Sequence, residues 1–112
     1  PPTEYPIVDI PLSHPIFHIV FDIEAYPQIT GIGYWANSGG DLSEVHPREP
    51  DRDVHIRGIF DPQGRLMVVL CHNTDLGDGW EEEAVHPQYF QEFSARKAYP
   101  LGINIVVYAM TH

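Results

Sequence analysis

The stretch between His72 and Glu83 carries the densest group of polar side chains that could bind or transform a small molecule. Its candidate ligand-binding residues are His72, Asn73, Thr74, Asp75, Asp78, Trp80 and Glu81. Together they offer hydrogen-bond donors, acceptors and one aromatic ring, and the glycines between them allow a ligand to approach the backbone closely. We therefore predict that a small polar ligand binds here, with Trp80 stacked on a ring and the carboxylates bonded to hydroxyl groups.

Two other interpretations use the same residues. In a hydrolase, His72 with Asp75 or Asp78 would act as the catalytic base, with or without a metal ion. In a purely structural loop, the Asn, Thr and Asp side chains would instead complete turns and cap helices. All three interpretations remain open at the level of sequence. A nucleophile and base pair made of Cys71 and His72 is excluded, because adjacent residues of a strand point to opposite faces.

Calcium is one metal that these residues could hold. The spacing does not fit an EF-hand, because position 5 counted from Asn73 is Gly77 and position 6 is Asp78. An irregular site with oxygen ligands from Asp75, Asp78 and Glu81 remains an alternative. No cofactor is evident from the sequence, and a divalent metal ion is the one that these residues could hold.

Zinc is the second metal to consider. It would require His14 and His18 to meet His72 across the fold, since three or four nitrogen or sulfur ligands are needed. His14 and His18 flank Pro15 in an extended region, which differs from the helical arrangement of paired zinc-binding histidines. No phosphate-binding glycine loop and no serine-hydrolase elbow occurs in the chain.

Composition narrows the function classes. The chain has 112 residues, 6 Lys and Arg, 16 Asp and Glu and a net charge of −10, which excludes the basic footprint of a nucleic-acid binder. A single cysteine excludes an internal disulfide. No apolar run approaches the roughly 20 residues that span a bilayer. The length suits one domain, residues 1–112, or a part of one.

A β-hairpin is the clearest local element. The runs 54–60 and 66–72 flank the turn sequence Asp61-Pro62-Gln63-Gly64, whose proline and glycine positions are typical of a type I turn. Residues 66–71 are apolar at every position. This pattern predicts a central strand that is covered on both faces, and hence a layered α/β arrangement.

The remaining segments are assigned by composition and periodicity. The prolines of residues 1–15 predict an extended segment, and the aromatic and β-branched run 17–23 predicts a strand or an extended segment that faces the core. Residues 36–53 are rich in glycine, proline and charge, which predicts an exposed loop insertion. Residues 87–96 predict a short helix that begins at a proline. The run 101–110 fits either a strand or a helix.

Several sequence blocks resemble the C-terminal part of the DUF4159 family, a bacterial family. The blocks are His14-Pro15-Ile16-Phe17-His18, Arg57-Gly58-Ile59-Phe60-Asp61, Gly64-Arg65-Leu66-Met67-Val68-Val69, His72-Asn73-Thr74-Asp75-Leu76-Gly77-Asp78-Gly79-Trp80-Glu81 and Ala98-Tyr99-Pro100-Leu101-Gly102-Ile103-Asn104-Ile105. The most specific of them lies within residues 65–81. The resemblance runs from Tyr5 onward and is interrupted in the 36–53 loop.

This resemblance implies a fold and its relatives. It implies the C-terminal portion of a flavodoxin-like three-layer α/β fold, related to class I glutamine amidotransferase-like and ThuA-like proteins. Family members are longer and usually begin with a half that this chain does not contain. The chain is therefore expected to be the C-terminal part of such a domain, with a single domain as the alternative. The relatives end in a helix packed on the sheet, which favours a helix over residues 100–111. The catalytic cysteine of the amidotransferases would fall in the absent half, so no glutaminase activity is implied.

The resemblance also implies residues of a pocket. In ThuA-like relatives, segments similar to His14-Pro15-Ile16 and Glu24-Ala25-Tyr26 line it, so His14 and Tyr26 join the candidate ligand-binding residues. The expected function is binding of a sugar-like or carboxylate-bearing ligand by the 72–81 loop. A hydrolase and a non-catalytic assembly subunit are the alternatives. Expected partners are the small ligand and a second copy or the missing half, and the sequence assigns no compartment.

Overall fold

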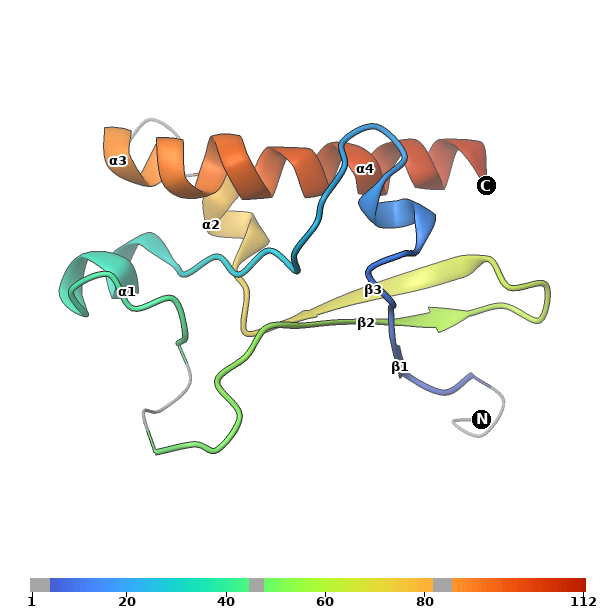
Figure 1. Cartoon of the computed structure of the whole chain (residues 1–112), viewed down its shortest axis with the longest axis horizontal. Helices are drawn as coiled ribbons and strands as arrows, with labels where there is room; N and C mark the ends of the chain where they lie inside the picture. Colours follow the sequence, from blue (N-terminus) through green and yellow to red (C-terminus); the bar gives the residue numbers. More distant parts are fainter. Residues whose placement is uncertain (1–4, 45–47, 82–85) are drawn as a thin grey trace.

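The computed structural model describes residues 5–44, 48–81 and 86–112 as one sheet with a helical layer on one of its faces (Figure 1). The elements are β1 (Val8–Asp9), the 3₁₀-helix η1 (Pro15–Phe17), α1 (Ile32–Asn37), β2 (His55–Phe60), β3 (Leu66–His72), α2 (Leu76–Glu81), α3 (Pro87–Tyr89), the π-helix η2 (Phe90–Ala98) and α4 (Tyr99–Thr111). The mixed α/β composition and the C-terminal helix that we predicted are confirmed.

The predicted hairpin is confirmed as β2 and β3. These strands pair antiparallel from His55 opposite His72 to Phe60 opposite Leu66, with one irregularity between Ile59 and Phe60. The backbone N–H of Gly64 donates to the carbonyl of Asp61 at 3.0 Å and closes the turn. Gly64 has φ 83°, a left-handed conformation that glycine adopts without steric cost.

The position of β3 corrects one prediction. The sheet order is β1-β2-β3 and all pairing is antiparallel, so β3 is an edge strand of the described sheet. Val68 and Leu70 are each 39% exposed, whereas Leu66 is 5% exposed beneath the helices. The prediction that residues 66–71 form a central strand covered on both faces is therefore wrong. An apolar residue indicates burial only where a second layer exists to cover it.

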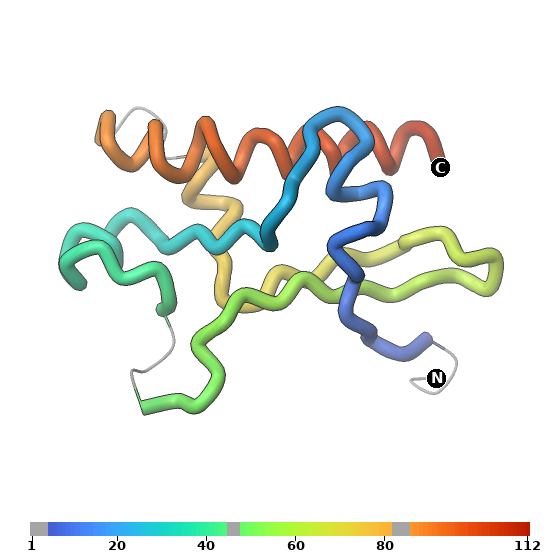
Figure 2. Tube along the Cα trace, in the orientation of Figure 1, coloured from blue at the N-terminus to red at the C-terminus, as the bar shows by residue number. Residues whose placement is uncertain are grey.

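The long helical segment starts where we predicted but does not end near Arg96. It begins at Pro87 and continues through η2 and α4 to Thr111, along the direction of the hairpin (Figure 2). Pro100 lies inside it and has no N–H to donate. The turns before this proline are π-helical, and the N–H of Tyr99 donates to the carbonyl of Ser94. The helix predicted over 100–111 is confirmed, and the strand alternative is wrong.

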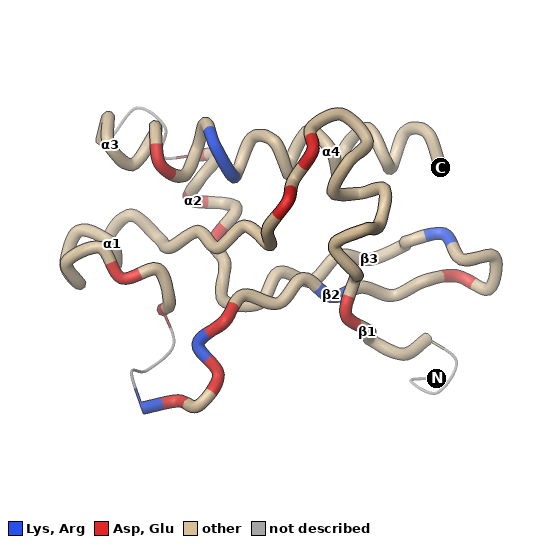
Figure 3. The backbone as a smooth tube through the Cα atoms, in the orientation of Figure 1, with Lys and Arg blue, Asp and Glu red and all other residues tan. Residues whose placement is uncertain are grey.

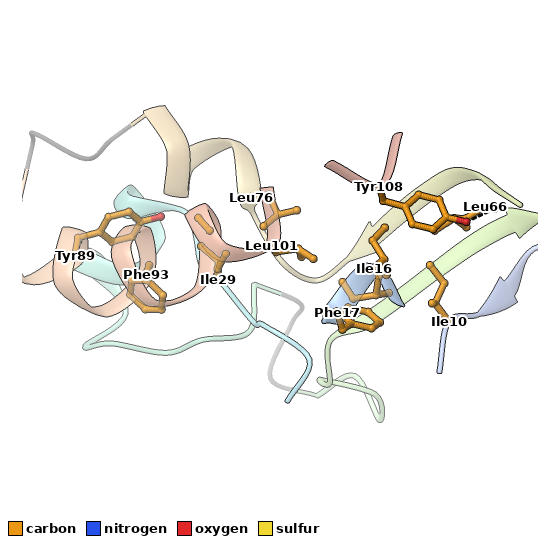
Figure 4. Packing of buried hydrophobic residues seen from close by; sticks show 12 residues of the cluster. Ile10, Ile16, Phe17, Ile29, Leu66, Leu76, Tyr89, Phe93, Leu101 and Tyr108 are labelled. Atoms are coloured by element: carbon orange, nitrogen blue, oxygen red, sulfur yellow. Dashed lines mark hydrogen bonds between the residues drawn. The ribbon is translucent and has the colours of Figure 1, made fainter. Parts of the chain in front are cut away.

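The core lies between the sheet and the long helical segment. Figure 4 shows its buried side chains, among them Ile16 and Phe17 from η1 and Leu101 and Tyr108 from α4. The phenol oxygen of Tyr108 accepts the backbone N–H of Leu66 at 3.0 Å and ties α4 to the start of β3. These contacts fix the end of the long helical segment over the sheet.

The strand predicted over 17–23 is not formed. Phe17 ends η1, and the following residues turn back so that the N–H of Ile23 donates to the carbonyl of Phe17 at 2.7 Å. The side-chain oxygen of Asn104 accepts the N–H groups of Val20 at 3.1 Å and Phe21 at 2.9 Å. A side chain on α4 thus satisfies backbone groups that a neighbouring strand would otherwise satisfy.

The described part of the 36–53 segment is mainly irregular, although Ala36 and Asn37 belong to α1. Arg52 pairs with Asp41 at 2.7 Å, and Arg52 also donates to the carbonyl of Ser43. Ser43 is 5% exposed, so the insertion folds back against the protein in this region. Residues 45–47 lie outside the described part.

The described elements form two layers. The flavodoxin-like three-layer fold stays a prediction, since the sheet described here is antiparallel and has helices over one face (Figure 1). Among the described residues, no helix is both long and apolar enough to cross a bilayer.

Candidate functional site

The 73–75 segment is held against residues 27–29 by hydrogen bonds. The hydroxyl of Thr74 donates to the carbonyl of Pro27 at 2.8 Å and accepts the N–H of Ile29 at 2.8 Å. The N–H of Asp75 donates to the carbonyl of Ile29 at 2.6 Å. Because both roles of the hydroxyl are used inside the protein, Thr74 positions the loop and has no remaining donor for a ligand.

Asn73 joins the same loop to the 36–53 insertion. Its side-chain nitrogen donates to the hydroxyl of Ser43 and to the carbonyl of Arg52, both at 2.8 Å. Its side-chain oxygen accepts the N–H of Glu44 at 3.0 Å. Asn73 has φ 55°, a left-handed conformation that asparagine tolerates better than most residues. The side-chain hydrogen bonds of both Asn73 and Thr74 thus hold the loop in place, as expected for a structural loop.

Three carboxylates meet at Gly31, which precedes α1, and we call Glu44, Asp75 and Asp78 the Gly31 cluster. Glu44 Oε1 accepts the N–H of Gly31 at 2.9 Å, and Asp78 Oδ2 accepts the N–H of Ile32 at 2.9 Å. A Cβ atom on Gly31 would lie 2.7 Å from Glu44 Oε1 and 3.2 Å from Oδ2 of both Asp75 and Asp78. Carboxylates from two segments, the insertion and residues 75–78, therefore surround a residue that has no side chain.

A hollow of about 550 Å³ opens beside this cluster. It is lined by Glu44, Val69, Cys71, Asn73, Thr74, Asp75, Leu76 and Gly77, and we call it the loop hollow. Burial raises the pKa of the Cys71 thiol, so it stays protonated at neutral pH and is a poor nucleophile. The loop hollow thus presents carboxylates together with apolar wall residues.

His72 lies apart from the loop hollow. Its ring centroid is 5.6 Å from that of His55, and His55 Nε2 lies 2.6 Å from Asp51 Oδ2. The pKa of Asp51 is lowered, first by the N–H of Asp53 that it accepts and then by its bond to His55. Within the described residues no hydrogen bond joins His72 to Asp75 or Asp78, so the catalytic pair of the hydrolase interpretation is not assembled.

Trp80 belongs to α2, and its ring packs against α4. Its indole N–H donates to the carbonyl of Ala98 at 2.7 Å, and a Cβ on Gly102 would lie 2.9 Å from its ring. Its exposed edge borders an apolar groove with Ile103 and Val106. Trp80 is absent from the lining of the loop hollow, so the structure does not join it to Asp75. Glu81 ends α2 and is exposed.

His14 and Tyr26 line other parts of the molecule. The ring of His14 lies against Phe60 and Tyr108, and His14 Nδ1 accepts the N–H of Ile16 at 3.1 Å. Burial, followed by the nearby His112, lowers the pKa of His14. Tyr26 donates to the carbonyl of Ile10 at 2.8 Å and borders a cavity beside the long helical segment.

The structure does not gather the metal ligands considered from sequence. His18 bonds the carbonyl of Leu12 and the carboxylate of Asp22, while His14 packs on Phe60 and His72 packs on His55. In residues 5–44, 48–81 and 86–112, no group of three or more His, Cys, Asp or Glu is arranged to hold a metal ion.

Sequence reasoning missed Glu44 and Gly31. Glu44 lies in an insertion without periodicity, and its contact with Gly31 spans 13 positions that include α1. No local pattern signals such a contact, because it depends on how the insertion folds back through Asn73 and Arg52. Asp75 and Asp78 were identified by residue type alone.

Comparison with known proteins identifies the family of the chain. No curated protein and no solved structure matches the chain. The family model described as a domain of unknown function (DUF4159) matches residues 2–110. Because this match covers almost the whole sequence, the chain belongs to the DUF4159 family.

Proposed function

We propose that this chain binds a small sugar-like ligand, rich in hydroxyl groups, in the loop hollow. The observation that carries the proposal is the convergence of the Gly31 cluster, with Glu44 and Asp75 lining a hollow of about 550 Å³. Volumes of about 300–1,000 Å³ are usual for small-ligand sites.

The hydrogen-bond inventory supports a ligand that supplies donors. Asn73 and Thr74 use their side-chain donors within the protein. The second oxygens of Glu44, Asp75 and Asp78 accept no hydrogen bond from the described residues. Ionised carboxylates only accept, so the matching ligand groups are hydroxyls. A carboxylate-bearing ligand, the other chemistry suggested by the sequence, would meet like charge in this hollow.

The apolar part of such a ligand would rest on the strand and helix that border the hollow. Val69 and Leu76 line it, and Leu76 is 8% exposed. Stacking on Trp80 is not part of the proposal, because Trp80 borders the separate groove on α4. The relation to ThuA-like proteins stays a prediction, and its His14 and Tyr26 do not line this hollow.

The test is an amide NMR titration of the purified chain with glucose, maltose and myo-inositol, with Ca²⁺ as a separate arm. We expect saturable shifts at residues 73–77 with at least one polyol. Asp75→Asn keeps the oxygen that caps Asp78 but replaces a free acceptor with a donor, so it should weaken binding about tenfold.

Glu49→Gln is the matched control, since it removes one exposed negative charge that does not line the hollow. It should leave the affinity unchanged. Absence of saturable shifts with all three polyols would refute the proposal. Response to Ca²⁺ alone, or equal affinity in Asp75→Asn, would also contradict it.

The hydrolase and the assembly-subunit interpretations stay predictions. His72 bonds neither Asp75 nor Asp78 among the described residues, so no observation favours hydrolysis over simple binding.

A further inference from the structure

The cavity beside the long helical segment differs from the loop hollow in its charge. It has a volume of about 560 Å³ and lies between residues 21–28 and the helical residues Arg96, Lys97 and Pro100. Leu42 and Val54 complete its wall. We call it the cationic cavity after Arg96 and Lys97, and the carboxylates of Asp22 and Glu24 also line it.

Arg96 and Lys97 have no carboxylate partner in the described part of the chain. Elsewhere Arg52 pairs with Asp41 at 2.7 Å and Arg57 pairs with Asp9 at 3.0 Å. The chain has 16 Asp and Glu residues for 6 Lys and Arg residues, so carboxylates are numerous enough to pair with every cation. Two neighbouring cations that remain unpaired at a cavity therefore need an explanation.

Lys97 is only partly accessible to water. Its Nζ donates to the carbonyl of Gln28 at 2.9 Å and lies 5.2 Å from the ring centroid of Phe93. Burial is the main reason why the pKa of Lys97 is lowered, and the charge of Glu92 offsets only part of this effect. The ammonium has two further N–H donors, and an anion in the cavity would compensate its lost hydration.

The acidic residues at the cavity limit which anions can enter. Asp22 and Glu24 line it, and Asp22 Oδ1 lies 3.1 Å from His18 Nδ1. A dianion such as a phosphate monoester would be repelled more strongly by them than a single carboxylate.

We propose that the cationic cavity binds a small organic monocarboxylate. The carboxylate bridges Arg96 and Lys97, and the planar guanidinium suits its two oxygens. The apolar part of the ligand rests on Pro100, Leu42 and Val54. This site is separate from the loop hollow and does not depend on the function proposed there.

The experiment is an amide NMR titration of the chain with benzoate and hexanoate. Benzamide serves as the neutral counterpart of benzoate and phenyl phosphate as its dianionic counterpart. We expect saturable benzoate shifts confined to residues 21–28 and 96–101, and no saturation with benzamide. Lys97→Met, which keeps an apolar stem, and Arg96→Gln should each weaken binding about tenfold.

Arg65→Gln is the matched control, because Arg65 bonds the main-chain carbonyl of His112 outside the cavity. It should change the affinity less than about twofold, within the scatter of exposed substitutions. Should Lys97→Met fail to fold, Arg96→Gln decides alone, since Arg96 is exposed. No saturable shift with either acid, shifts elsewhere, equal binding of benzamide, or an unaffected Arg96→Gln would each overturn the proposal.

Discussion

Asn104 shows how one buried amide decides the path of a distant segment. It is fully buried in α4, and its side chain bonds Val20 N–H, Phe21 N–H and the carbonyl of Phe21. These three bonds use the acceptor and one donor of the side chain. Segment 18–23 therefore crosses the helix instead of pairing with a strand.

Truncation of this side chain should be costly. Asn104→Ala is expected to lower the free energy of unfolding by about 1–3 kcal/mol, because backbone groups lose their partners and a small cavity forms. Urea denaturation followed by circular dichroism measures the change. The control is Asn37→Ala, whose side chain makes one exposed bond to the carbonyl of Gly33 and should cost less than about 0.5 kcal/mol. Equal losses in the two variants would contradict the role assigned to Asn104.

A second prediction at the scale of single residues concerns Thr74. Thr74→Val keeps the shape of the side chain but leaves the N–H of Ile29 without its acceptor, and Ile29 is fully buried. We expect a loss of about 1–3 kcal/mol on unfolding. Thr74→Ser retains the hydroxyl and should lose clearly less, which chemical denaturation of both variants will show. A smaller loss for the valine variant would indicate that the hydroxyl does not hold the loop.

At the scale of elements, the glycines of β2 and α1 lie in opposite environments. A Cβ on Gly58 would lie 2.5 Å from Leu66 Cδ1 and 2.7 Å from the carbonyl oxygen of Val68, so the hairpin has no room for it. A Cβ on Gly33 would meet nothing within 4 Å. The same substitution should therefore have opposite effects.

Gly58→Ala should destabilise the chain by about 1–3 kcal/mol, the usual cost of overpacking. Gly33→Ala should stabilise it by up to about 1 kcal/mol, because alanine lowers the entropy lost when a helix forms. Thermal unfolding of both variants beside the parent chain provides the measurement. A neutral Gly58→Ala would mean that β2 and β3 separate more easily than their packing indicates.

The elements that local chemistry specifies were predictable, and those that depend on distant contacts were not. The hairpin followed from the turn Asp61-Pro62-Gln63-Gly64, whose hydrogen bond is local. The run 17–23 has strand propensity, yet η1 and Asn104 give it another path. Propensity is a weak guide where tertiary contacts satisfy the backbone.

The residues of the candidate site likewise include some that the sequence indicates and others that depend on distant contacts. Asp75 and Glu44 line one hollow, but the sequence pointed only to Asp75, because Glu44 reaches the site through a fold of the insertion. Trp80 was expected beside Asp75, yet α2 directs its ring onto Gly102 of α4. The orientation of a residue on a short helix depends on the element that it packs against, which no spacing rule supplies.

At the scale of the whole molecule, charge is unevenly distributed. Neither β3 nor α4 contains Lys, Arg, Asp or Glu, whereas charged residues concentrate around the insertion and the start of β2 (Figure 3). The net charge of −10 counts the seven histidines as neutral, so their full protonation would bring it to −3 (−10 + 7). Repulsion within the folded chain therefore depends on pH just below neutrality.

Two histidines whose pKa is shifted act in opposite directions. The pKa of His18 is raised, first by its bond to the carbonyl of Leu12 and then by Asp22. Its contribution to stability is complete below about 6.5, the value in the unfolded chain, and is lost as pH rises through the raised value. The pKa of His14 is lowered by burial, so its contribution is lost as pH falls below about 6.5.

Because these two local effects oppose each other, the change in net charge should dominate the response to salt. We expect added NaCl to raise the unfolding temperature more at pH 8 than at pH 5.5, since salt screens repulsion that is strongest when the charge is −10. Differential scanning calorimetry from low to high NaCl at both pH values tests this. An equal or smaller rise at pH 8 would show that ion pairs such as Arg52–Asp41, which salt weakens, outweigh the general repulsion.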